Sequence, residues 1–215
     1  MTTAPGEFIL ANTALIAPPL VPEIRLHLAT EVVPLWRKTE EELAKEGVPP
    51  PYWAFAWAGG QALARYILDN PQIVLGKTVL DFGAGSGLVA LAAAKSGAAH
   101  VTAADIDSFS RAAIQLNAQS NAAQIECVGA DVIGSAGNWQ VILVGDMCYE
   151  RPLAERLTAW LAECVARNVV VLVGDPGRSY FPKTGMEKLS TYHVAVSRDL
   201  EDREIRETSV YKFLG

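Results

Sequence analysis

The sequence is poor in the residues that form disulfide frameworks and metal sites. Its 215 residues include only three cysteines, Cys127, Cys148 and Cys164, which are too few and too scattered for a disulfide scaffold or a zinc site. We therefore expect buried thiols in a reducing compartment. The three histidines also lack the spacing of metal ligands, so the sequence predicts no resident metal ion.

Positive charge and long apolar runs are scarce as well. The net charge is −6 and the pI is near 5.1, which argues against nucleic acid as the main partner because phosphates need a basic face. No apolar run approaches the length of a membrane span. The first residues show neither a secretory signal nor an Arg-rich transit peptide. We expect one domain, acting as a monomer, without a membrane or nucleic-acid partner.

The strongest positive signal is a segment that combines a buried strand, a glycine turn and a helix, at residues 78–95. Asp81 lies near the end of the strand. Gly83, Gly85 and Gly87 allow a ligand to lie against bare backbone, and the helix directs its N-terminal amides at the same turn. This pattern predicts a nucleoside-binding βαβ unit in which these four residues bind the cofactor.

Two further acidic positions follow predicted strands. Asp105 ends a strand at residues 100–104, about 20 residues after the middle glycine, a spacing suited to holding two ribose hydroxyls. Its neighbour Ile106 belongs to the same predicted cofactor site. Asp131 follows a strand at residues 124–128 and could accept a hydrogen bond from an adenine amino group. The alternative interpretation of Asp131 is a turn-capping aspartate.

The glycine turn is compatible with two nucleoside cofactors, because residues 85–90 also satisfy the dinucleotide fingerprint of NAD proteins. Asp81, however, would repel a pyrophosphate, whereas it can meet the amino group of a methionine moiety. The chain also contains only one such βαβ unit, and a dinucleotide fold usually spans two. These features favour S-adenosylmethionine as the cofactor.

The remaining pattern predicts an α/β, Rossmann-like single domain of five βα units closed by a hairpin, which resembles the fold of class I methyltransferases. That resemblance implies a seven-stranded, mostly parallel sheet with a C-terminal antiparallel hairpin. We expect an N-terminal extension, residues 1–75, to pack on the cofactor-binding core, residues 76–215. The other predicted elements are an edge strand or docked arm at 8–10, a short helix or strand at 23–28, an acidic helix at 40–46, helices at 61–70, 109–119 and 153–167, and strands at 141–145, 169–173, 192–196 and 209–213.

An aromatic segment at residues 52–60 precedes the first long helix. Trp57 stands just before a glycine pair, where its ring could line the cofactor pocket or present a face to a cation. Trp53 is predicted to line the substrate site, although a hydrophobic plug on the sheet explains it equally well.

These segments together resemble the seven-stranded protein lysine methyltransferases, and among them enzymes that modify the β subunit of electron-transfer flavoprotein. The resemblance extends over nearly the whole chain from about residue 20. It implies a lysine side chain of a protein as the acceptor. The animal relatives are mitochondrial, and because no presequence is evident we expect a bacterial cytoplasmic member. The segments that carry it are residues 22–26, 51–54, 57–63, 81–85, 145–149 and 174–178.

The Asp-x-x-Tyr segment supplies the predicted catalytic and substrate-binding residues, Asp146 and Tyr149. A free lysine has a pKa near 10.4 and arrives protonated. The negative charge of Asp146 favours this ammonium, so its expected role is to capture and aim the lysine rather than to remove its proton. Tyr149 would hydrogen-bond the amine or line its channel. Two alternatives remain open: methylation of a small amine or hydroxyl compound, and a non-catalytic nucleoside-binding protein.

Overall fold

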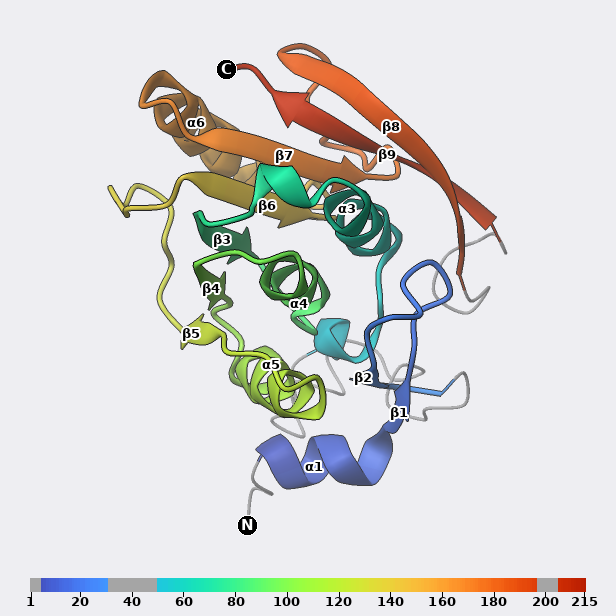
Figure 1. Cartoon of the computed structure of the whole chain (residues 1–215). Helices are drawn as coiled ribbons and strands as arrows, with labels where there is room; N and C mark the ends of the chain where they lie inside the picture. The colour runs from blue at the N-terminus through green and yellow to red at the C-terminus, as the bar shows by residue number, and fades with distance from the viewer. Residues whose placement is uncertain (1–4, 31–49, 197–204) are drawn as a thin grey trace.

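A computed structural model describes residues 5–30, 50–196 and 205–215 (Figure 1). The strands are β1 (Ala14–Ile16), β2 (Leu26–Leu28), β3 (Thr78–Phe82), β4 (His100–Ala104), β5 (Glu126–Val128), β6 (Val141–Gly145), β7 (Val170–Asp175), β8 (Met186–Ala195) and β9 (Ile205–Phe213). The helices are α1 (Pro5–Asn12), α3 (Ala58–Asp69), α4 (Leu88–Lys95), α5 (Ser108–Ser120) and α6 (Arg151–Ala166), with 3-10 turns η2 (Tyr52–Ala54) and η3 (Pro71–Ile73).

Seven strands form one sheet in the order β5-β4-β3-β6-β7-β9-β8, and β1 and β2 form a separate antiparallel pair. Strands β5, β4, β3, β6 and β7 are parallel, and β9 is antiparallel to both of its neighbours. The predicted seven-stranded, mostly parallel sheet with a C-terminal antiparallel hairpin is therefore confirmed.

Helices cover both faces of the sheet, which explains the nearly continuous apolar runs of its central strands. Val79 of β3 belongs to the core beneath α3, α4 and α5, whereas Leu80 and Phe82 belong to the core beneath α6. Figure 1 shows α3, α4 and α5 following one another along one face, with α6 on the other.

Some predicted elements differ from the observed ones. Residues 8–10 lie in helix α1, which packs on α5, so the edge strand was wrong and the docked arm was right. The open choice at residues 23–28 resolves to strand β2. Residues 129–140 and 176–185 contain no helix, so the prediction of five βα units was wrong. The predicted acidic helix at residues 40–46 lies outside the described residues.

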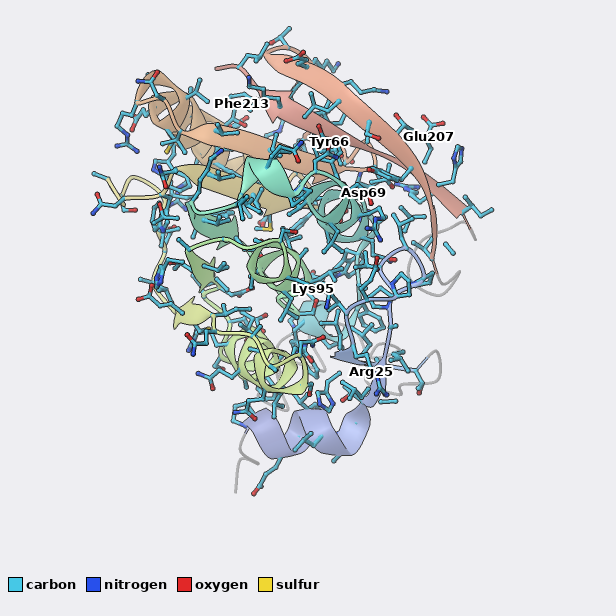
Figure 2. All side chains as sticks on the ribbon, in the orientation of Figure 1. Arg25, Tyr66, Asp69, Lys95, Glu207 and Phe213 are labelled. Carbon is cyan, nitrogen blue, oxygen red and sulfur yellow. The ribbon has the colours of Figure 1, made fainter. Side chains whose placement is uncertain are left out.

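Two asparagines, Asn117 of α5 and Asn121 at its C-cap, attach the N-terminal segment to the core. The backbone N–H of His27 donates to Oδ1 of Asn117 at 2.7 Å, and Nδ2 of Asn117 donates to the carbonyl of Ser86 in the glycine turn at 2.8 Å. One helical turn later, Asn121 pairs with both backbone groups of Arg25, which lies on the N-terminal segment (Figure 2). Buried backbone groups need such partners, so α5 connects β2 to the glycine turn.

Glycines allow the start of α3 to lie directly against the ends of β6 and β7. A Cβ on Gly59 would come within 2.2 Å of the carbonyl oxygen of Gly174, and a Cβ on Gly174 would come equally close to the carbonyl oxygen of Gly59. A Cβ on Gly145 would approach the Cα of Gly60 at 3.1 Å. The glycines of the sequence segments 57–63, 145–149 and 174–178 thus meet in one close backbone contact.

This contact predicts opposite outcomes for two adjacent substitutions. Gly59→Ala should lower the free energy of unfolding by about 2 kcal/mol or more, because its methyl group meets backbone that cannot move aside. Gly60→Ala should remain within about 1 kcal/mol of wild type, since its Cβ meets only a side-chain methyl of Val89 at 4.0 Å and alanine favours helices. Urea denaturation of both variants measures the difference. Equal stabilities would contradict the proposed close contact.

Candidate active site

The carboxyl ends of the central parallel strands bring together acidic residues that are far apart in the sequence. Asp81 lies on β3, Asp105 follows β4, Asp146 follows β6 and Asp175 ends β7. Ligands of open α/β sheets bind at this edge. Each of the four carboxylates accepts at least one backbone N–H, so their positions are fixed by the fold.

Asp105 reaches the glycine turn, as its spacing indicates. Its two oxygens accept from the backbone N–H groups of Gly85 and Asp107, both at 2.9 Å. Burial raises the pKa of Asp105, and these amide donors oppose the rise. Asp107 in turn caps α5 by accepting from two backbone amides of its first turn. Ile106, between the two acids, is 74% exposed.

Asp81 lies beneath the start of α4 and is 1% exposed. Its carboxylate accepts from the backbone N–H of Ala90 at 2.9 Å, and burial raises its pKa to about 7. Asp81 also lines a small cleft together with Trp57, Gly83 and Gly145. The cleft thus has a titratable carboxyl group beside the glycine turn and an aromatic ring on another side.

The glycine turn leaves room for a ligand on its outer side. Gly83, Gly85 and Gly87 all have positive φ angles, of +62°, +53° and +79°. A Cβ on Gly85 would meet nothing within 4 Å. The backbone of Gly85 therefore faces open space at the position predicted to lie against the cofactor.

Asp146 follows β6 with φ +56° and joins two elements. One carboxylate oxygen accepts from the backbone N–H groups of Gly59 and Gly60 in the first turn of α3. The other accepts from Nε of Arg178 at 2.9 Å and from Nη2 at 2.7 Å. Trp57, the N-cap residue of α3, provides no side-chain cap, so Asp146 takes over that function.

Arg178 is itself held in place by its surroundings. Oδ1 of Asp175 accepts from the backbone N–H groups of Gly177 and Arg178, each at 2.7 Å. The guanidinium of Arg178 lies 5.6 Å from the centre of the Trp57 ring, a cation–π distance. Asp175 is 1% exposed, burial raises its pKa to about 6, and its second oxygen is buried without a hydrogen-bond partner in the structure.

Three aromatic rings form a chain of contacts that begins at Trp57, beside Arg178. Tyr149 is 46% exposed, and its ring centre lies 5.9 Å from that of Tyr52, which is 41% exposed. Tyr52 in turn lies 6.1 Å from Trp57, whose indole N–H donates to the carbonyl of Tyr52. We call Tyr52, Trp57 and Tyr149 the aromatic rim.

Two predicted site residues have surroundings that do not favour the roles assigned to them. Trp53 is 1% exposed and stacks on Phe109 within the cluster that includes Ile9. This is the hydrophobic plug, and the exposed ring next to it belongs to Tyr52. Asp131 is exposed and accepts from Arg156 and from the backbone N–H of Ile133, as a turn-capping aspartate does.

Sequence reasoning assigned no function to Arg178 or to Tyr52, although both lie in segments that carry the family resemblance. No spacing rule connects Arg178 to Asp146, because the two meet only through the pairing of β6 with β7. Within the residues that the structure describes, no group of three His, Cys, Asp or Glu could hold a metal ion. No helix among them is long and apolar enough to cross a membrane.

Solved structures share the fold at low sequence identity. A magnesium protoporphyrin IX methyltransferase from Synechocystis PCC 6803 aligns with 71% of this chain and 76% of its own, with a TM-score of 0.53 and 14% identity. A Thermoplasma acidophilum protein aligns with 72% of this chain and 89% of its own, with a TM-score of 0.55 and 18% identity. The sheet order and the likeness to these structures define the class I methyltransferase fold.

Sequence comparison identifies the family. The electron transfer flavoprotein beta subunit lysine methyltransferase of Xenopus laevis is 40% identical over 98% of this chain and 87% of its own. The human enzyme is 36% identical over 90% of this chain and 76% of its own. This chain belongs to the electron transfer flavoprotein beta subunit lysine methyltransferase family. The family profile of the ribosomal protein L11 methyltransferase (PrmA) also matches residues 62–144.

The relatives confirm the predicted family and the predicted methyltransferase activity, but they contradict one prediction. The expectation of a bacterial cytoplasmic protein was wrong, because the relatives that match most of the chain come from animals, including Xenopus laevis, Danio rerio, Homo sapiens and Caenorhabditis elegans. That expectation depended on the first residues of the chain, which carry no information about source.

The burial of Asp81 predicts a pH-dependent stability. Its pKa rises from an ordinary value of 3.8 to about 7 in the folded protein. The stability contributed by its bound proton is therefore fully present below about pH 4 and is lost as pH rises through 7. Asp81→Asn keeps an acceptor for Ala90 without the buried charge. In urea denaturation, the variant should exceed wild type by on the order of 1 kcal/mol or more at about pH 8.5, and this advantage should shrink as pH falls below 7 and be lost below about pH 4. An advantage that does not vary with pH would contradict a buried, titrating Asp81.

Proposed function

We propose that this protein is an S-adenosylmethionine-dependent N-methyltransferase that methylates lysine side chains of the β subunit of electron-transfer flavoprotein. The observation that carries the proposal is the name shared by relatives that match up to 98% of the chain. The site supports it independently, because Trp57 of the aromatic rim lines the cleft of the glycine turn together with Gly145, the residue before Asp146.

The residues of the glycine turn fit this cofactor. Each Asp105 oxygen accepts one backbone N–H and retains capacity for a ribose hydroxyl. We assign Asp81 to the amino group of the methionine moiety, and Trp57 lines the same cleft. We assign the adenine side to Ile106, whereas the contacts of Asp131 with Arg156 and the backbone of Ile133 favour a turn cap over adenine binding. When bound, S-adenosylmethionine supplies an electrophilic methyl group on a sulfonium and leaves as S-adenosylhomocysteine.

The openness of the aromatic rim favours a protein acceptor over a small molecule. Tyr52 and Tyr149 keep 41% and 46% of their surfaces exposed, so a side chain projecting from another protein can approach between rings that are already in place. Aromatic faces also attract ammonium groups. Asp146 and Tyr149 are therefore the proposed residues of the acceptor side, and Tyr52 replaces Trp53 as the neighbouring ring.

The same rim supports trimethyllysine as the product. Each methyl group removes an N–H donor but preserves the positive charge. A site that required several hydrogen bonds to the amine would stop after one transfer. A site whose aromatic faces hold the amine continues to attract a dimethylated amine through ring contacts.

The proposal is tested by incubating the purified protein with S-adenosylmethionine and electron-transfer flavoprotein. Intact-protein mass spectrometry should show up to three added methyl groups per modified lysine of the β subunit. Gly85→Arg is the control, since a long side chain there fills the open side of the turn and should abolish cofactor binding. Monomethyl product alone would contradict the rim model. Transfer only to small amines would favour the alternative function.

Asp81 also predicts how cofactor binding depends on pH. The amino group that Asp81 pairs with stabilises the ionised carboxyl, whose pKa in the free protein is about 7. Binding should release a proton below about pH 7, and affinity should fall by up to about tenfold per pH unit as pH decreases further. Calorimetry in two buffers of different ionisation enthalpy measures this proton. Asp81→Asn should release no proton on binding. An unchanged proton release in that variant would show that another group is the source.

A further inference from the structure

The proposed acceptor-side carboxylate is already paired within the protein. Asp146 accepts two backbone N–H groups of α3 on one oxygen and two guanidinium N–H groups of Arg178 on the other. An ionised carboxylate offers about four acceptor sites, so these four donors occupy them. The predicted capture of a lysine ammonium by a direct hydrogen bond to Asp146 would therefore require Arg178 to leave.

Arg178 is anchored rather than poised to move. Asp175 fixes its backbone N–H at 2.7 Å, its guanidinium makes two bonds to a single oxygen of Asp146, and Trp57 lies against its face. Its ion pair is also largely shielded, since the side chains of Arg178 and Asp146 are 17% and 9% exposed. Shielding strengthens the mutual influence of charges in this site.

Methyl transfer requires a neutral amine. Its lone pair forms the new N–C bond while the electrons of the breaking C–S bond stay on sulfur, and the resulting ammonium must lose a proton to water before the next transfer. A carboxylate without a partner would hold that proton on the amine. A guanidinium at hydrogen-bonding distance cancels most of the carboxylate's field at the acceptor.

We propose that Arg178 is a positioning residue that neutralises Asp146, so that the acceptor lysine reacts as a free amine beside an ion pair. The proposal depends on the function proposed above. Asp146 then serves to fix α3 and Arg178, and the rings of Tyr52 and Tyr149 contact the amine.

Among the residues that the structure describes, the other titratable groups near the ion pair do not replace this function. Burial raises the pKa of Cys148 to about 12 and also raises that of Tyr149, so both stay neutral through most of the relevant range. Asp175 titrates near pH 6, below the range in which a lysine loses its proton. Asp105 and Glu150 also act on Tyr149 electrostatically, but as negative charges neither can neutralise Asp146.

The test compares the pH dependence of kcat for wild type, Arg178→Gln and Arg178→Lys, with electron-transfer flavoprotein at saturation. kcat reports ionisations in the bound complex. Removing the charge at Arg178 should raise the midpoint of the acid limb by on the order of one pH unit, because the uncompensated carboxylate retains the lysine proton. Arg178→Lys should restore a midpoint near that of wild type. Arg151→Gln is the matched control, since it removes a nearby cation that contacts Tyr180, and its midpoint should not move.

Calorimetric binding of S-adenosylmethionine verifies that each variant retains its fold. A lower maximal kcat in Arg178→Gln, with an unchanged midpoint of the acid limb, would overturn the proposal, because Arg178 would then be only a structural contact. A lower KM with an unchanged midpoint would also overturn it, since Arg178 would then occupy the place of the acceptor. If Arg178→Gln does not fold, a shifted midpoint in Arg178→Lys would overturn it and an unshifted one would support it. Inactivity of the wild type instead rejects the proposed acceptor.

Discussion

The arrangement of the site depends on the contact between the first turn of α3 and the ends of β6 and β7. Gly59 and Gly174 approach so closely that neither position has room for a Cβ, and Asp146 accepts the amides that this helix start exposes. The contact fixes Trp57 at the cleft and aligns Arg178 with Asp146. If α3 were displaced, the cleft wall, the ion pair and the aromatic rim would change together.

Backbone amides stabilise most of the acidic edge before any ligand arrives. Such donors lower the cost of burying a carboxylate without adding mobile side chains. Asp105 and Asp146 each have donors on both oxygens, whereas one oxygen of Asp175 has no donor among the described residues. The carboxylates at this edge thus have fixed positions, which favours electrostatic preorganisation over rearrangement during the reaction.

The sequence predicted those features that depend on local pattern. The glycine turn and Asp105 at its spacing were both readable, because each involves residues within one βαβ unit. The Asp146–Arg178 pair was not, since strand pairing alone brings these residues together. Trp53 and Tyr52 are adjacent aromatics, and only packing against α5 determines which ring is buried. Helix α1 was missed because its stability comes from docking on α5.

The side chain of Asn117 joins two regions that are usually considered separately. It accepts from the backbone of β2 and donates to the carbonyl of Ser86 within the glycine turn. Because one side-chain amide makes both hydrogen bonds, displacing either backbone segment weakens the hydrogen bond to the other. Strand β2 therefore helps to hold the glycine turn in place, and a relative with a different N-terminal segment would need another support for this turn.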